Sequence, residues 1–528
     1  MKKLLLASPL AAALCLAIWL TQSGCTILGF AVGASQDNRQ PKQEMTVQGM
    51  EIYAIKAQTR ITVYRKNLEP LTGYFKEAVR MNPKTDTAVN GILLQQKSVD
   101  HRIPLDQIDH VYVPGRKATG KIIGAVVGLA IDAGLYVLAL SNLELDLFSG
   151  FGGLCPYVYS FDGARYQLDA ELCSGAFYPA AQRSDWGALP HLRAVNGAYK
   201  IKLANELNET DYIDHLRLLV FEHAPGARIC PSAGGAFIEV AQPRGPRTAR
   251  TAEGLEVSGL LRAADEDCWL SNPLGRDAEC DQVELTFDKP AHAAGAALLL
   301  RLRNTDWVAA QYRALLALHG RALPQWYDQL QSNAATRTEW ESMLHRECDL
   351  QIQVWDGVAW QPAGSIRPVG PAVERELALE VDLSAMAGEV LRIRLDVPPG
   401  YWLVNTVQAD FSYARATPAH TLLPENATTP NGTNNTAALR QADGAFLAMP
   451  ARGDCTEIVF RAPVPRPNLD RTVLVHGSGY YTLNTTAAGE PQAALLDRLL
   501  HEPGAYNRWR LQTLNQQVKA LNAPGLLR

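Results

Sequence analysis

An internal repeat is the feature of this sequence that most constrains its fold. Residues 161–166 read Phe-Asp-Gly-Ala-Arg-Tyr and residues 355–360 read Trp-Asp-Gly-Val-Ala-Trp, so both follow the pattern aromatic-Asp-Gly-x-x-aromatic. Three further pairs of similar segments follow in the same order: 199–203 with 391–395, 212–216 with 402–406, and 284–290 with 457–463. Each match alone is weak, but four in one order indicate a duplication. We therefore predict that residues 151–346 and 347–528 are two copies of one unit.

The repeated segments favour strands over helices. Asp-Gly between two aromatic residues predicts a β-hairpin with a two-residue type I′ turn, in which both turn residues have positive φ. Residues 199–203 read Tyr-Lys-Ile-Lys-Leu, which is the alternation of a strand with one buried face. Each copy then ends in a helical stretch. The expected fold class is mainly β with appended helices, and each copy is expected to be a β-sandwich.

The first 24 residues have the composition of a secretory signal peptide. Lys2 and Lys3 precede an apolar stretch over residues 4–20. The small residues of Ser23-Gly24-Cys25 resemble a bacterial lipobox, which implies cleavage before Cys25 and attachment of diacylglyceryl to its sulfur. Gln22 departs from that motif, which usually has Leu there. The expectation is a lipoprotein signal peptide over 1–24, with Cys25 as the lipid attachment site.

The residues after the cysteine suggest the destination. Thr26 stands where an inner-membrane retention signal would place Asp, so the outer membrane is the expected location in the cell envelope. Residues 25–44 are expected to tether the lipid to the first domain. Lys and Arg number 50 against 54 Asp and Glu, a near balance that shows no footprint of nucleic-acid binding. The expected partners are therefore the membrane, through the lipid, and an envelope protein or a glycan.

Two further segments precede the repeat. Residues 45–117 contain several short strand-like runs, which predict a small SH3-like or Sm-like β-barrel. Residues 118–150 form a glycine-rich apolar stretch and linker, with a glycine at every fourth position from Gly120. Residues 122–140 are long enough to span a membrane, but Asp132 lies inside them and the basic flank is on the periplasmic side. We favour a helix that packs on protein or at the membrane, and a span stays the alternative.

Cysteine usage fits an oxidising compartment. Cys268 and Cys280 flank the turn-forming residues Asn-Pro-Leu-Gly at 272–275, which would bring the two thiols together. We predict a disulfide between them.

One segment carries a family resemblance. Residues 155–163 read Cys-Pro-Tyr-Val-Tyr-Ser-Phe-Asp-Gly, which resembles a Cys-Pro-x-Val-Tyr-Ser-x-Asp-Gly motif of uncharacterised bacterial envelope lipoproteins. Those proteins also have runs similar to residues 300–305, Leu-Arg-Leu-Arg-Asn-Thr, and the resemblance covers about residues 150–480. It implies no established activity.

No catalytic or metal-binding motif stands out. His476 and Ser478 follow a strand-like run as in the oxyanion loop of α/β-hydrolases, but the chain has no Gly-x-Ser-x-Gly nucleophile elbow. We predict that Val473 and Val475 face a core, that residues 477–479 form a turn, and that Ser478 is not catalytic. His345 and Cys348 lack the second ligand pair that a closed zinc site needs. No catalytic residue, metal or cofactor is therefore expected.

Tryptophans are the remaining candidates for a binding site. Trp355 and Trp402 lie in apolar runs and are expected in the core, whereas Trp269 and Trp360 are the candidate ligand-facing aromatics. The sequence thus favours a non-catalytic binding or scaffold protein, with glycan binding as its sharper form. An unrecognised envelope enzyme of the hydrolase class is the alternative.

Overall fold

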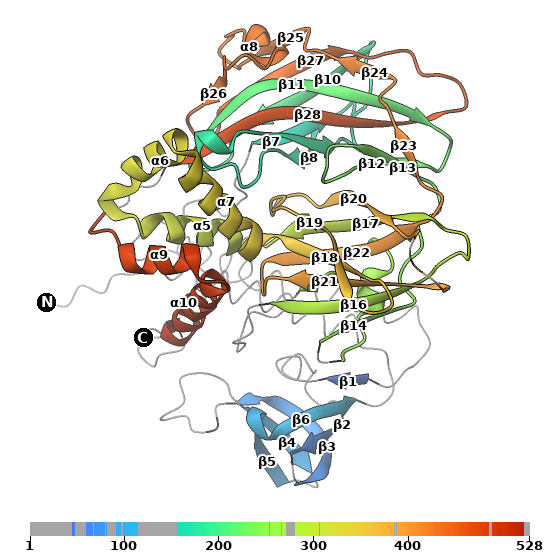
Figure 1. Cartoon of the computed structure of the whole chain (residues 1–528), viewed down its shortest axis with the longest axis vertical. Helices are drawn as coiled ribbons and strands as arrows, with labels where there is room; N and C mark the ends of the chain where they lie inside the picture. Colours follow the sequence, from blue (N-terminus) through green and yellow to red (C-terminus); the bar gives the residue numbers. More distant parts are fainter. Residues whose placement is uncertain are drawn as a thin grey trace, which may run out of the picture. The chain divides into compact units, whose positions relative to one another are not determined.

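The computed structural model of the chain describes residues 45–47, 60–113 and 156–521, apart from short gaps (Figure 1). The gaps are 67, 80, 82–90, 97–98, 253, 266, 271–279, 306, 385, 387 and 485–487. The signal peptide, Cys25, the tether and the glycine-rich segment 118–150 lie outside the described residues. Within the described residues, no helix has both the length and the apolar character needed to cross a membrane.

The chain divides into two compact units, and residues 45–113 belong to the smaller one. It contains a six-stranded antiparallel sheet of order β1-β6-β2-β3-β4-β5. The strands are β1 Met45–Val47, β2 Arg60–Arg65, β3 Leu68–Val79, β4 Gly91–Gln96, β5 Val99–Pro104 and β6 Ile108–Val113. Its core is apolar and includes Ile61, Phe75 and Leu94. The 3₁₀ turn Leu105–Gln107 connects β5 to β6. The prediction of strands over 45–117 is thus confirmed at the level of an antiparallel sheet.

The larger unit holds most of residues 156–511 and is built from the predicted repeat. The first copy contributes β7 Tyr157–Phe161, β8 Tyr166–Glu171, β9 Arg183–Ala188, β10 Ala198–Ala204, β11 Glu209–His223, β12 Arg228–Pro231, β13 Phe237–Val240, β14 Thr248–Thr251, β15 Trp269–Leu270, β16 Asp281–Asp288 and β17 Gly295–Asn304. The second copy contributes β18 Leu350–Trp355, β19 Trp360–Ile366, β20 Arg375–Asp382, β21 Val390–Val397, β22 Trp402–Asp410, β23 Ala414–Ala416, β24 His420–Leu422, β25 Asn426–Thr428, β26 Leu447–Met449, β27 Cys455–Arg461 and β28 Asp470–Leu483.

These strands form two sandwich-like pairs of antiparallel sheets (Figure 1). The first sandwich has one sheet of order β25-β27-β10-β7-β8 and one of order β24-β11-β28-β9. The second sandwich has sheets of order β14-β16-β21-β18-β19 and β15-β22-β17-β20. The core of the first sandwich is one buried apolar cluster to which both of its sheets contribute, for example Val158, Ile201, Leu216 and Val475. The mainly β class with appended helices is confirmed.

Each sandwich takes strands from both copies of the repeat. In the first sandwich β10 pairs with β27 and β11 pairs with β28. In the second sandwich β16 pairs with β21 and β17 pairs with β22. The prediction that residues 151–346 and 347–528 each form a β-sandwich is therefore wrong, because the late strands of each predicted copy pair with the early strands of the other.

The two sandwiches correspond strand by strand. In the sheet orders, β7, β8 and β10 of the first sandwich take the places that β18, β19 and β21 take in the second. Even an irregularity is repeated: the register skips Asp214 where β11 pairs with β28, and it skips Asn405 where β22 pairs with β17. All four matched segment pairs of the sequence lie on corresponding strands, with the bulges shifting the 212–216 match by one position.

The hairpin turn differs in detail from its prediction. Phe161 pairs with Tyr166, so the loop has four residues rather than two. Gly163 has a φ of +105°, but Asp162 is not among the residues of positive φ, so the turn is not type I′. The Asp162 carboxylate instead accepts hydrogen bonds from the backbone N–H groups of Ala164 and Arg165, at 2.8 and 2.9 Å. The Asp162 side chain thus caps the four-residue loop by satisfying two of its backbone donors.

Helices and one small sheet complete the larger unit. The helices are α4 Ser258–Leu261, α5 Trp307–Ala317, α6 Leu323–Ser332, α7 Ala334–Cys348, α8 Thr436–Arg440, α9 Ala493–His501 and α10 Ala505–Leu521. The three-stranded sheet β12-β13-β23 lies between the two sandwiches. One of its faces places Ile229 against Leu474 of the first sandwich, and the other places Ile238 with Leu299 of the second.

Candidate functional site

An outward-facing aromatic patch marks the second sandwich. On β18 and β21, Ile352 and Ile393 are buried, whereas Trp355 and Arg392 lie on the opposite face of the sheet. The rings of Trp355 and Trp360 meet edge to face with centroids 5.4 Å apart. The Arg392 guanidinium lies 4.9 Å from the centroid of Trp355 and 5.3 Å from that of Trp360. Both tryptophans are half-buried, so the prediction that Trp355 belongs to the core is wrong.

The first sandwich has a similar arrangement, in which Lys202 stands at the position of Arg394. Phe161 and Tyr166 occupy the places of the two tryptophans, and their ring centroids are 5.3 Å apart. The Lys202 ammonium lies 4.3 Å from the ring centroid of Tyr159 and 5.8 Å from that of Tyr166. We call these two surfaces the aromatic patches: Tyr159, Phe161, Tyr166 and Lys202 in the first sandwich, and Trp355, Trp360, Arg392 and Arg394 in the second.

Each aromatic patch also contains a carboxylate on the neighbouring strand. The Tyr166 hydroxyl donates a hydrogen bond to Glu457 on β27. Arg392 donates to Glu284 on β16 at 3.2 Å, and Arg394 forms an ion pair with Asp396 at 3.2 Å. Because β16 and β27 hold the same place in the two sheets, the acid is duplicated with the rings. The cations are therefore balanced locally, and the patches are close to neutral.

The turn beside each patch is electrostatically alike in both copies. Asp162 accepts from the backbone N–H groups of Arg165 and Ala164, and these hydrogen bonds lower its pKa to about 2. Asp356 accepts from the N–H groups of Ala359 and Val358, which hold its pKa below the usual value. Both carboxylates thus stay ionised over the physiological pH range.

A cleft of about 500 Å³ lies between the two sandwiches. Strands β8 and β9 of the first sandwich line one side, and β12, Arg301 of β17 and residues 372–377 line the rest. Trp186 contributes the large aromatic surface: one face of its indole ring stacks on His476, with centroids 5.1 Å apart and planes 8° apart. A volume of this size is typical of small-molecule sites. The sequence did not single out Trp186.

Three carboxylates line this cleft, and each has a partner. His191 lies with its Nδ1 2.5 Å from Asp169, Arg301 donates to Glu374 at 2.7 Å, and Arg228 forms two hydrogen bonds of 2.8 Å with Glu376. These pairings fix the carboxylates in position.

At the base of the cleft, one ion pair joins the two sandwiches. Arg375 of β20 donates to both oxygens of Asp185 on β9, at 2.6 and 3.0 Å. Burial pushes the pKa of Asp185 up, but the charges of Arg375 and Arg183 outweigh it and hold the pKa below its usual value. Arg183 and Arg375 hold corresponding positions in the two sandwiches. Arg183 pairs with Gly479 and Arg375 pairs with Leu302, and both of these partners lie next to the bulge.

The hydrolase-like pair lies behind Trp186. Val473 and Val475 face the core as predicted, but residues 477–479 are inside β28 and not in a turn, because the strand continues to Leu483. His476 accepts a hydrogen bond from Nε of Arg217 at 2.8 Å. Burial, with the charge of Arg217, lowers the pKa of His476 to about 4. Ser478 accepts from Gln182 at 3.3 Å.

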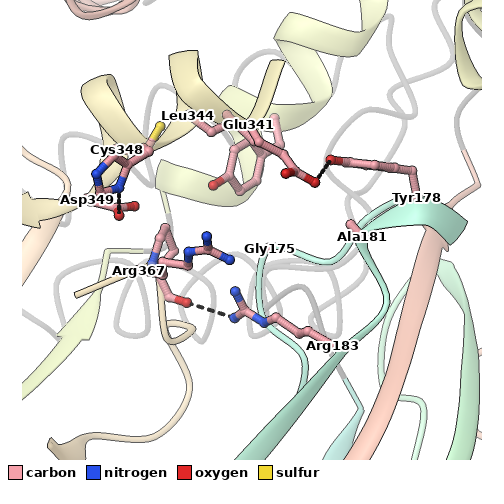
Figure 2. Close-up of a pocket in the computed structure, with 12 residues that line it drawn as sticks. Gly175, Tyr178, Ala181, Arg183, Glu341, Leu344, Cys348, Asp349 and Arg367 are labelled. Carbon is pink, nitrogen blue, oxygen red and sulfur yellow. Dashed lines mark hydrogen bonds and ion pairs between the residues drawn. The ribbon is translucent and has the colours of Figure 1, made fainter. Parts of the chain in front are cut away.

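A second, smaller cavity of about 80 Å³ lies beside α7 (Figure 2). Figure 2 shows the guanidinium groups of Arg183 and Arg367 facing its interior. Arg183 donates to the carbonyl oxygen of Pro368 at 3.2 Å. Across the cavity, Tyr178 donates to Glu341 at 3.4 Å, and His345 Nδ1 lies 2.5 Å from Asp349. Opposite charges therefore face each other across a space for only a few heavy atoms.

Two buried carboxylic acids lie on β11 of the first sandwich. Glu209 and Asp211 are fully buried on the same face of β11, and their carboxylate oxygens have no hydrogen-bond partner within the described part of the chain. Burial raises the pKa of Asp211 to about 8, and burial together with Asp211 raises the pKa of Glu209 well above its usual value. The pair is therefore held in its acid form at neutral pH.

The structure places the predicted site residues very differently. Trp360 is half-exposed in an aromatic patch, whereas Trp269 is 5% exposed, so its prediction as a ligand-facing ring is wrong. Its strand β15 pairs with β22, which buries the ring. Cys280 has an exposed, free thiol and Cys268 is buried. Because residues 271–279 lie outside the described residues and the disulfide is not formed in this structure, it stays a prediction.

Metal sites are also not formed in the described part of the chain, where no group of three or more His, Cys, Asp and Glu side chains is placed to hold an ion. His345 and Cys348 are separated in role: the first pairs with Asp349, and burial raises the pKa of the Cys348 thiol to about 12.

These features define a mainly β protein built from antiparallel, sandwich-like sheets. No family model and no curated relative matches the chain. Three weak structural matches are viral. "The Triple Jelly Roll Fold and Turret Assembly in an Archaeal Virus" has 7% identity over 62% of this chain and 90% of that one, with a TM-score of 0.12. A chain of Sulfolobus Turreted Icosahedral Virus has 6% identity over 62% and 97%, with a TM-score of 0.12. The VP2 protein of Infectious Bursal Disease Virus has 11% identity over 71% and 89%, with a TM-score of 0.12. Scores this low carry no argument about fold or function.

Proposed function

We propose that this chain is a non-catalytic, glycan-binding lipoprotein of the bacterial cell envelope, and that the two aromatic patches are its binding surfaces. One observation carries the proposal: a partly exposed aromatic pair with a cation over its second ring, Lys202 over Tyr166 and Arg394 over Trp360, occurs at corresponding outward positions of both sandwiches. These side chains lie on the sheet face opposite the core, so packing of the core does not explain them.

The chemistry of the patches supports a sugar ligand. The C–H faces of a pyranose ring pack on aromatic rings, and its hydroxyl groups form hydrogen bonds with neighbouring carboxylate and guanidinium groups. Because Arg392 and Arg394 are already paired with Glu284 and Asp396, the patch favours an uncharged glycan over an anionic one. Two equivalent patches on one chain suit a polymer of repeated units, since a second contact strengthens binding without new chemistry.

The envelope location rests on the sequence. Cys25 would carry the lipid that holds the protein at the outer membrane, and the smaller unit, which we propose to close as an SH3-like or Sm-like barrel, would follow the tether. The Cys25→Ser variant should move the protein from the membrane to the soluble fraction. A variant that stays fully membrane-bound would refute the lipid anchor and return attention to residues 122–140.

Co-sedimentation with insoluble polysaccharides tests the glycan proposal. The full chain is incubated in detergent with chitin, cellulose and peptidoglycan sacculi, and the bound fraction is measured. Trp360→Ala and Tyr166→Ala should each weaken binding at least tenfold, and the double variant should abolish it. Tyr74→Ala is the control, because Tyr74 is 49% exposed on the smaller unit. Binding that is unchanged in the double variant would refute the patches as the surface.

The alternative, an envelope hydrolase, has one observation in its favour. His215 lies directly across from Ser478 in the β11–β28 pairing, and its ring nitrogens have no hydrogen-bond partner within the described residues. Both side chains are less than a tenth exposed, which closes them to a substrate. Esterase activity that disappears in Ser478→Ala would favour this alternative.

A further inference from the structure

The cleft between the sandwiches is separate from the aromatic patches and is the wider of the two cavities described above, with about 500 Å³ against about 80 Å³. We propose that it is a second sugar site, which takes a short uncharged saccharide of one or two rings. This inference rests on the proposed function and assigns to the cleft a short saccharide, whereas the patches are proposed to bind a polymer.

The size of the cleft limits its occupant. An apolar cavity of roughly 150 Å³ holds a benzene molecule, so a cleft of about 500 Å³ has room for two pyranose rings and not for a long chain segment. It lies where β9 and β20 of the two sandwiches come together, joined below by the Asp185–Arg375 ion pair. A ligand there contacts both sandwiches at once.

The wall of the cleft has the groups that a sugar needs. Trp186 lines it with an indole ring whose orientation is fixed by stacking on His476 and an edge contact with Phe237. A half-buried, fixed aromatic ring binds a sugar face without losing rotamer entropy on binding. Leu168, Ile229 and Val373 add apolar surface beside it.

The polar groups favour hydroxyls over charges. Glu374 and Glu376 are each paired with an arginine, and Asp169 is held by the His191 ring, so the wall presents fixed hydrogen-bond acceptors, two of them with their charge compensated. A carboxylate oxygen has more than one lone pair, so each acid can still accept from a sugar hydroxyl. An unpaired carboxylate, by contrast, would have favoured an amine.

Titration of the full chain in detergent with cellobiose, maltose and N,N′-diacetylchitobiose tests the cleft, by calorimetry and by tryptophan fluorescence. At least one disaccharide should bind. Trp186→Ala should weaken this binding at least tenfold, and Trp186→Phe should restore most of it. Tyr74→Ala is the control and should leave disaccharide binding unchanged, because Tyr74 is 49% exposed on the smaller unit and belongs to neither proposed site.

A second variant guards against loss of folding in Trp186→Ala. Ala188 lines the cleft and is exposed on β9, so Ala188→Trp fills the space while the buried contacts stay in place. It should abolish disaccharide binding with an unchanged melting temperature. Disaccharide binding that depends on Trp360 and not on Trp186, or binding of polymers alone, would overturn the cleft site and leave the proposed function standing. If no sugar binds at all, both the cleft site and the proposed glycan-binding function would be refuted. Binding of glucosamine but not of N-acetylglucosamine would refute the proposal that the ligand is uncharged.

Discussion

The two sandwiches share their strand order, their bulge and their outward aromatic patches, but they differ on the inner sheet around the cleft. Where the first sandwich has His476, Ser478 and Trp186, the second has Leu299, Arg301 and Ala378 at the corresponding positions of the pairing. The two sandwiches therefore share an exposed surface that packing does not require, and differ on a face directed toward the other sandwich. This contrast is the reason for assigning repeated-unit binding to the patches and a unique ligand to the cleft.

The strongest way to break the comparison is to separate the copies. We expect that chains 45–332 and 333–528, expressed alone, form no folded sandwich. In each of the four sandwich sheets, a strand of one copy pairs with a strand of the other. Co-expressed, they should assemble into one complex. Circular dichroism and amide NMR dispersion report the folding.

Two independently folded fragments with dispersed spectra would show that each copy closes a sandwich of its own. The pairing of strands between the two copies would then be wrong, and the two copies would be separate domains.

The second test compares the corresponding arginines. Arg375→Met should lower the free energy of unfolding by about 3–5 kcal/mol, because it leaves the buried Asp185 carboxylate without its bidentate partner. Arg183→Met should cost less, because the hydrogen bonds of Arg183 within the described part of the chain go to the neutral carbonyl oxygens of Ser174 and Pro368 and not to the Asp185 carboxylate. Urea unfolding measures both, and equal losses would contradict the role assigned to the ion pair.

The third test uses the buried pair Glu209 and Asp211 of the first sandwich. The position of Asp211 corresponds to Trp402 in the second sandwich, so the pair is not repeated there. Because burial raises the pKa of Asp211 in the folded state, the unfolded chain loses this proton first as the pH rises. The contribution of Asp211 to stability is thus fully present at low pH and falls between the usual carboxyl pKa and about 8, by about 1.4 kcal/mol per pH unit for its one proton. Asp211→Asn should remove this slope for one proton, as measured by urea unfolding from pH 4 to 8. A steeper slope in the variant would contradict the assignment.

The fourth test asks whether the two hairpins are equivalent. Gly163 and Gly357 have φ values of +105° and +104°, which a side chain disfavours, and neither has close atoms where a Cβ would be. Gly163→Ala and Gly357→Ala should therefore cost about the same, on the order of 1–2 kcal/mol, from backbone strain alone. Costs that differ by more than about 1 kcal/mol would show that the hairpins have diverged.

The sequence allowed the mainly β class and many of the strands to be predicted, because aromatic-Asp-Gly hairpins and alternating strands are local signals. The exchange of strands between the copies was not predictable, since β10 has the same pattern whether its partner is β16 or β27. Trp360 was found because it flanks the repeated turn. Trp269 was misplaced because a two-residue strand such as β15 has no periodicity to reveal its buried face. Trp186 was missed because its partner His476 is nearly 300 residues away in the sequence.

The smallest expected effect is at Ser478, whose counterpart in the second sandwich is Arg301. Its hydroxyl accepts one hydrogen bond from Gln182, and Gln182 also donates to Asp214 at 2.9 Å, so the amide keeps a partner when the hydroxyl is removed. Ser478→Ala should therefore lower the free energy of unfolding by about 1 kcal/mol or less and leave glycan binding unchanged. Urea unfolding, with co-sedimentation and an esterase assay on the same preparations, checks the three readouts together. If the wild type has esterase activity and Ser478→Ala loses it without loss of stability, the inner sheet of the first sandwich is catalytic. The difference between the two sandwiches would then be one between a catalytic and a binding domain.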